Sequence, residues 1–213
     1  MYLPHPNAEL TARFREKPYQ GAAPESARFL FLGLDANYSA DLGEQDVFGN
    51  VLAYHEDGVA FWRRHGVHHP FLLQGYRGGG RHYHRSFARI GFLPEHAPEI
   101  SFAELLHVPT VGRNRLVLGD LDSGHLERLD RAIHAGCGRH VFVPAGVARL
   151  MRASGQFSWL PERPMGQSAD LGVLHETASG NRVYAHLHFS VYGKHQRRKE
   201  LEAIAIRALV EPR

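Results

Sequence analysis

Cysteine and long apolar runs are both scarce in this sequence, and each shortage excludes classes of protein. Cys137 is the single cysteine in 213 residues, so the chain forms no internal disulfide and no four-cysteine zinc or iron–sulfur site. No apolar run reaches the roughly 20 residues that a membrane-spanning helix needs. The first residues, MYLPHPNAELTARFREKPYQ, lack the apolar core of a signal peptide. We therefore expect a cytoplasmic protein with no membrane partner.

An excess of charge of one sign is also missing. The formal net charge is +3 with histidine neutral, which is compatible with a polyanionic partner but does not identify one. The hydrophobic share of 43% and the charged share of 22% are typical of a globular domain. Histidine, by contrast, is abundant. The 16 histidines gather mainly at His65, His68, His69, His82 and His84, and again at His186, His188 and His195.

Predicted strands and helices alternate along the chain. Apolar segments predict strands over 27–34, 101–109, 140–146 and 181–190, and helical patterns cover 57–64, 84–92, 123–135, 146–154 and 194–210. We expect residues 35–56 to be mostly loop, and Leu201, Ile204, Ala205, Ala208 and Leu209 to form the apolar stripe of the last helix. The alternation predicts a three-layer α/β/α fold with a mostly parallel central sheet. Residues 1–27 are expected as a short helix from about Asn7 and a linker, and 28–213 as one domain.

Two of the predicted strands end in reactive side chains. Asp35 follows FLFLGL, and His188 ends VYAHLHFS. The carboxyl ends of parallel strands share one rim of a sheet, where open α/β proteins bind their ligands. A carboxylate and an imidazole on one rim form a plausible general base and electrophile. Taken singly, each residue also fits a structural role, as a turn former or as a hydrogen-bonded histidine.

The two segments together resemble the active-site motifs of uracil-DNA glycosylases. GLDANYS, residues 33–39, resembles the first motif of that family, GQDPYH, and HFSVYGK, residues 188–194, resembles the second, HPSPLS. The order of the motifs is the same, and HVFVPAG between them resembles the family's apolar strand ending in glycine. The resemblance extends over most of the chain from residue 28 onward.

The resemblance implies hydrolysis of the bond between the sugar and a damaged or mispaired base that is flipped out of DNA. Asp35 would orient a water molecule and stabilise the cationic sugar, and His188 would donate a hydrogen bond to the departing base. The implied partner is duplex or single-stranded DNA. The implied enzyme is a monomer that acts in base excision repair and needs no cofactor and no metal.

Further residues follow from the same resemblance. Phe48, thirteen residues after Asp35, would stack on the base, His107 would read its edge, and Asn37 replaces the tyrosine that blocks the thymine methyl group. In the second motif and the basic run GKHQRRKE, the expected DNA contacts are Ser190, Tyr192, Lys194 and Arg197. A core phenylalanine, a structural histidine, a surface tyrosine and a solvated helix face are the alternatives.

Departures from the family pattern leave the base unidentified. Ala36, Phe189 and Val191 stand where prolines are common, and with Asn37 they leave uracil, thymine and hypoxanthine all open, as well as loss of activity. Three other functions remain open. They are a metal site at the histidine pairs of 82–84 and 186–188, a non-catalytic nucleic-acid or protein-binding module, and a glycosidase that acts on free nucleosides.

Overall fold

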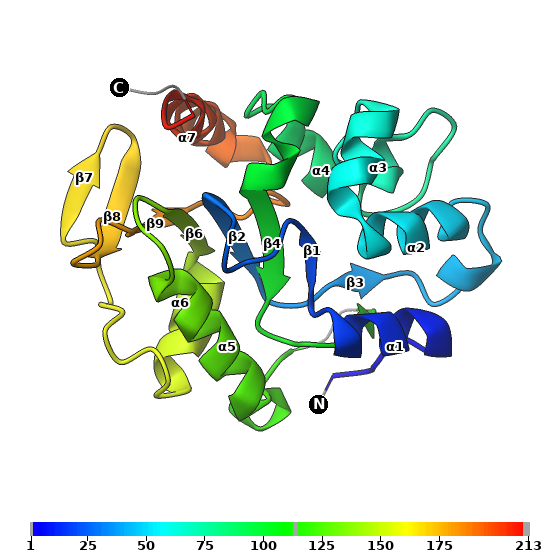
Figure 1. Ribbon diagram of the computed structural model, residues 1–213, viewed down its shortest axis with the longest axis horizontal. Helices are drawn as coiled ribbons and strands as arrows, with labels where there is room; N and C mark the ends of the chain where they lie inside the picture. The colour runs from blue at the N-terminus through cyan, green and yellow to red at the C-terminus, as the bar shows by residue number, and fades with distance from the viewer. Residues whose placement is uncertain (1, 113–114, 211–213) are drawn as a thin grey trace.

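The protein is described by a computed structural model over residues 2–112 and 115–210 (Figure 1). A seven-stranded sheet has the order β1-β4-β2-β6-β9-β8-β7. Its strands are β1 (Tyr19–Gly21), β2 (Phe29–Gly33), β4 (Ile100–Glu104), β6 (His140–Pro144), β7 (Gly166–Ser168), β8 (Leu171–Glu176) and β9 (Arg182–His186). The four central strands, β4-β2-β6-β9, pair in parallel, whereas β1, β8 and β7 pair antiparallel. A separate small ladder joins β3 (Asn37–Tyr38) to β5 (Thr110–Val111).

Helices cover both faces of the sheet (Figure 1). They are α1 (Ala8–Glu16), α2 (Phe48–Glu56), α3 (Gly58–His65), α4 (Arg81–Ala88), α5 (Ser123–His134), α6 (Ala145–Ala153) and α7 (Gln196–Ala208). Successive side chains of a strand point to opposite faces. Phe29 and Phe31 accordingly pack in the core with α3, α4 and α7, and Leu30 and Leu32 pack in the core with α5 and α6. Both faces of β2 are therefore buried, which explains its continuous apolar run.

The predicted α/β class is confirmed, with a parallel core as expected and antiparallel edges that the sequence did not predict. The N-terminal helix begins as expected, because the Asn7 side chain accepts a hydrogen bond from the Leu10 amide at 2.9 Å. The stretch after this helix is more than a linker, since it contributes β1, which pairs with β4. The expectation of loop over 35–56 was wrong in its second half, where α2 begins at Phe48.

The apolar stripe predicted for the last helix was also wrong in part. Leu201 and Ile204 are exposed, at 38% and 67%. Lys199 and Glu202 are buried instead, together with Ala205 and Ile206. The physical reason is that both charged side chains hold the chain segment before the helix by hydrogen bonds to its backbone. Among the described residues, no helix has the length and apolar character required to cross a membrane.

Candidate active site

A cavity of about 360 Å³ lies at the carboxyl ends of β2 and β4. Asp35, two residues after β2, and His188, two residues after β9, both line it. They come together because β2, β6 and β9 run parallel and end on the same rim of the sheet. The two residues that the sequence singled out therefore face one shared space.

The Asp35 carboxylate is held by the small β3–β5 ladder. Its Oδ2 accepts a hydrogen bond from Thr110 Oγ1 and lies 3.5 Å from Asn37 Nδ2. The same Asn37 nitrogen donates to Thr110 Oγ1 at 2.9 Å and to the Gly112 carbonyl at 2.7 Å. Asn37 lines the cavity, but both of its amide hydrogens are already used. Its observed contacts position Asp35, rather than leaving the amide nitrogen free to read a base.

The His188 ring is oriented by Ser190. The Ser190 amide donates to His188 Nδ1 at 3.3 Å, and the Ser190 hydroxyl lies 2.6 Å from the same atom. An amide can only donate, so Nδ1 is an acceptor and the neutral ring carries its proton on Nε2. Burial lowers the pKa of His188, an effect that Asp35 opposes and Lys199 reinforces. The imidazole is thus a neutral N–H donor, and Ser190, for which a DNA contact was expected, is exposed and also contacts this imidazole.

Two buried charged residues of α7 fix the segment that carries His188. Lys199 Nζ donates to the carbonyls of Phe189 and Val191 and to Ser86 Oγ, at 3.1, 2.7 and 2.8 Å. On the other side of His188, the Leu187 amide donates to Glu202 Oε2 at 2.7 Å. Sequence analysis missed both residues because charged side chains in a helix are usually solvated. Their spacing of three, which places them on one helix face, was the available signal.

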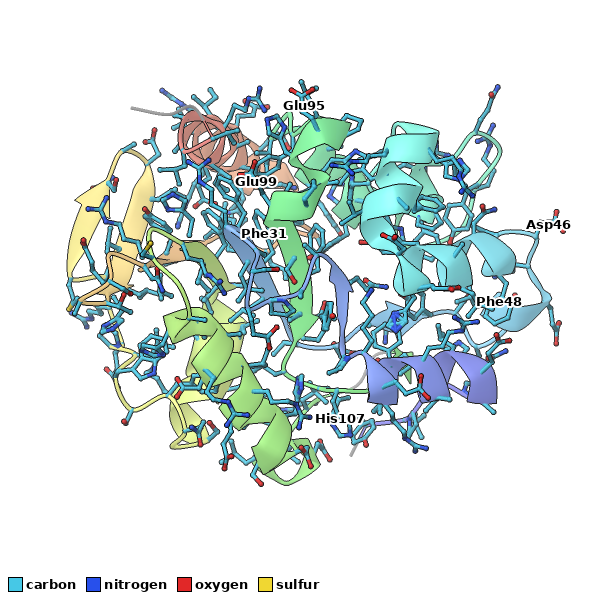
Figure 2. All side chains as sticks on the ribbon, viewed as in Figure 1. Phe31, Asp46, Phe48, Glu95, Glu99 and His107 are labelled. Atoms are coloured by element: carbon cyan, nitrogen blue, oxygen red, sulfur yellow. The ribbon has the colours of Figure 1, made fainter. Side chains whose placement is uncertain are left out.

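Aromatic rings form the walls of the cavity, but Phe48 is not among them. Tyr38, Tyr54, Phe71, Tyr83 and Phe102 line it. Phe48 begins α2 toward the side of the molecule (Figure 2) and packs against the apolar cluster behind the cavity wall, which includes Leu42 and Val51 as well as Tyr38 and Phe71. Phe48 is absent from the lining of the cavity, so its position does not support the predicted stacking on a base. The prediction relied on the spacing of thirteen residues from Asp35 to Phe48. Phe48 begins α2, a helix that the sequence analysis did not predict, and it does not line the cavity.

His107 also lies outside the cavity. Its ring is 5.8 Å from that of His125 in α5, on the lower side of the molecule in Figure 2. Burial lowers the pKa of His107, and its Nδ1 has no hydrogen-bond partner within the described part of the chain. The predicted role of His107 in reading a base edge is therefore not supported by its position.

Glu104 reaches the cavity three residues earlier. It ends β4 directly opposite Gly33, and its carboxyl lies over that glycine so closely that a Cβ there would clash with Oε2. Burial, and secondarily the charge of Asp35, raises the pKa of Glu104 well above its ordinary value. Sequence analysis missed it as a site residue, although an acidic residue ending the apolar segment ISFAE was the signal.

The remaining predicted contacts lie on the surface beyond His188. Tyr192 is 74% exposed, with its ring 5.5 Å from that of His82. Lys194, in the turn just before α7, and Arg197, in the first turn of α7, are both exposed. The short interval from His188 keeps these three side chains near the segment that contributes to the cavity, and their exposure leaves them accessible to a partner.

The histidine pairs do not assemble a metal centre in the described structure. His84 stacks on His69 with ring centroids 3.5 Å apart, whereas His82 faces Tyr192. No group of three histidine, cysteine, aspartate or glutamate side chains in residues 2–112 and 115–210 is arranged to hold a metal ion.

Comparison with protein-family models, with curated proteins and with solved structures gives no match. The function must therefore be inferred from the chemistry of the cavity and from the motifs that surround it.

Proposed function

We propose that this protein is a DNA glycosylase of the uracil-DNA glycosylase type, which hydrolyses the N-glycosidic bond of a flipped damaged or mispaired base. The single observation that carries the proposal is that Asp35 and His188 line one cavity with aromatic walls. The resemblance of their motifs to those of the family supports it. Planar rings lining a cavity suit a planar base, because aromatic faces stack on any base.

The chemistry follows from the two groups. When the C1′–N bond breaks, its electron pair leaves with the base and positive charge develops on the sugar. The Asp35 carboxylate stabilises that charge, orients the water that adds to C1′ and accepts the proton that this water releases, while Thr110 and Asn37 hold the carboxylate in place. The N–H of His188 donates to the base as its negative charge grows. One positioned donor of this kind contributes a rate factor of about 10² to 10³.

The surface beyond His188 supplies the proposed contact with DNA. Lys194 and Arg197 would neutralise phosphates, and Tyr192 would stack in the gap that the flipped base leaves. Because these residues follow His188 within ten positions, binding of the strand and positioning of the imidazole involve the same segment.

The test is release of a base from labelled duplexes that carry uracil, thymine opposite guanine, or hypoxanthine, followed by alkaline cleavage of abasic sites. We expect the wild type to release at least one of these bases. Asp35→Asn and His188→Ala should each slow release by about 100-fold or more. Asp46→Asn and His65→Ala, which change exposed residues outside the cavity, are the matched controls and should behave as the wild type.

A non-catalytic nucleic-acid-binding module is the second candidate. It is favoured by the exposed Tyr192, Lys194 and Arg197, which require no chemistry at Asp35. Wild-type protein that binds the duplexes but releases no base from any of them would support this candidate and contradict the glycosylase proposal.

A further inference from the structure

A second cavity, of about 270 Å³, lies between α4 and α7, and the proposed reaction does not use it. It adjoins the candidate active site, because Leu187 and Phe189 line it while His188, between them, lines the first cavity. Helix α4 also contributes to both cavities, with Tyr83 in the first and Ser86 in the second. One short segment and one helix therefore separate the two spaces.

The walls of this α4–α7 groove are mostly apolar. The apolar side chains are those of Ile90, Leu187, Phe189, Ala203, Ile204 and Ile206. Ile204 is 67% exposed, so the groove opens to solvent along α7. The volume is roughly nine times the share of one water molecule in the liquid, about 30 Å³. The groove therefore has room for the ring of a single nucleobase.

One buried polar group that lines the groove is left with an unused acceptor. His186, at the end of β9, is 5% exposed. The Leu187 carbonyl lies beside one of its ring nitrogens, which is therefore the N–H donor. Burial lowers the pKa of His186 to about 3, so the other nitrogen is an acceptor, and it has no hydrogen-bond partner among the described residues. A hydrocarbon would leave this acceptor unused, whereas a heterocyclic base with an N–H or amino group would satisfy it.

The solvent-facing side of α4 next to the groove is positively charged. Arg81 and Arg85 in α4 and Arg89 at its C-terminal cap follow at intervals of four residues and lie on one side of the helix. No ion pair in the described part of the chain involves these three arginines, and the first turn of α4 has no acidic residue. Like charges at this spacing destabilise a helix. A bound anion would therefore relieve a repulsion that the protein leaves uncompensated.

The acidic groups of the groove belong to α7 and already have partners. Glu200 accepts a hydrogen bond from Gln196 at 2.8 Å. Glu202 accepts from the Leu187 amide at 2.7 Å and from Arg198 at 2.8 Å. The cationic side of the groove is therefore α4, and α7 contributes most of its apolar wall.

We propose that the α4–α7 groove is a second nucleotide subsite, in which Arg85 and Arg89 hold phosphates and the apolar walls take one unstacked base of the strand that occupies the active site. The inference rests on the proposed function for the identity of that strand as DNA. A cationic surface that follows the backbone, beside a pocket for a base, is typical of proteins that bind single-stranded nucleic acids. The subsite favours single-stranded DNA or an opened duplex, because a base within a duplex stays paired and stacked.

The first test measures affinity for a single-stranded oligonucleotide with one tetrahydrofuran abasic analogue, so no base release is needed. The double variant Arg85→Gln/Arg89→Gln should bind about 20-fold more weakly at 0.1 M salt, and its salt slope should fall by about 1.4, since each phosphate contact on a single strand contributes about 0.7. Arg63→Gln/Arg64→Gln removes two exposed arginines of α3 and should leave both quantities unchanged. An unchanged slope in the Arg85/Arg89 variant would overturn the inference.

The second test locates the unstacked base. 2-Aminopurine, whose fluorescence rises when it unstacks, replaces single bases at successive positions on either side of the abasic analogue. In the wild type, binding should raise the emission at one position beyond the nearest neighbours. Ala203→Trp, which fills the groove from α7, should abolish that rise, whereas Ala53→Trp, at an exposed alanine of α2, should retain it. A rise that persists in Ala203→Trp, or no rise beyond the nearest neighbours in the wild type, would overturn the inference.

The subsite and the glycosylase proposal fail separately. If no base is released from any duplex but both binding results hold, the glycosylase proposal fails and the subsite stands. If a base is released while Arg85→Gln/Arg89→Gln binds as the wild type does, the subsite is overturned and the glycosylase proposal stands. Melting curves check the folding of each variant. Arg85 and Arg89 are exposed, so the arginine test decides the question even where Ala203→Trp does not fold.

Discussion

At the scale of single residues, the site depends on what holds each reactive group. Asp35 is positioned by Thr110 and Asn37, and His188 by Ser190. The motif resemblance predicted Asp35 and His188 but not their supports, because Thr110 meets Asp35 only through the pairing of β3 with β5. Asn37 and Ser190 were predicted as ligand contacts. Asn37 bonds to Thr110 and Gly112 beside Asp35, and Ser190 bonds to His188.

Thr110→Val tests the support of Asp35. Valine keeps the branched shape of this fully buried side chain but removes the hydroxyl that donates to the carboxylate. We expect kcat to fall by about tenfold with little change in KM, because a less ordered carboxylate affects the transition state more than binding. Thr11→Val, at a buried threonine whose hydroxyl donates to the His5 carbonyl, is the matched control. An unchanged kcat in Thr110→Val would show that the hydroxyl has no positioning role.

At the scale of elements, apolar strands were predictable and the packing of polar residues between elements was not. The segments FLFLG and HVFVP are buried strands as expected, since continuous apolar runs suit parallel strands covered on both faces. Glu104 enters the cavity because β4 pairs with β2 in a register that no local pattern encodes. The buried face of α7 was misjudged because Lys199 and Glu202 satisfy backbone groups of the segment around His188.

Lys199→Met tests this link between α7 and the site. Methionine preserves the length of the side chain but removes the donor to the Phe189 carbonyl, and it leaves the Val191 carbonyl with only the 3.5 Å contact to His82 Nε2 among the described residues. We expect the free energy of unfolding to fall by about 2 kcal/mol, measured by urea denaturation. Amide hydrogen exchange should also become faster over residues 187–191. Lys194→Met, at an exposed lysine of the same region, is the stability control and should leave both quantities unchanged.

At the scale of the whole molecule, histidines are part of the core as much as of the surface. His55, His68, His69, His84, His140 and His186 all have pKa values that burial lowers. The abundance of histidine was evident from the sequence, whereas its division between core and surface depends on tertiary packing. His68, His69 and His84, for example, gather beside the cavity from two separate segments of the chain.

This distribution predicts unfolding in mild acid. A histidine whose pKa is lower in the folded protein contributes stability above its unfolded pKa of about 6.5, and the contribution is lost as the pH falls toward the folded value. The folded values are about 4 for His55 and His140 and about 3 for His84 and His186. The melting temperature should therefore fall steeply between about pH 6.5 and pH 4.

His55→Phe isolates one contribution to that acid sensitivity. His55 is 1% exposed, stacks on Phe14 with centroids 4.2 Å apart, and has two ring nitrogens with no partner among the described residues. Phenylalanine keeps the stacking and removes the buried polar atoms, so the variant should be about 1 kcal/mol more stable at pH 7. The gain should grow as the pH falls, because the variant has no imidazole to protonate on unfolding. Melting curves of wild type, His55→Phe and the exposed control His65→Phe across this range check both points. A variant that is less stable than wild type at every pH would show that the His55 ring is required for packing.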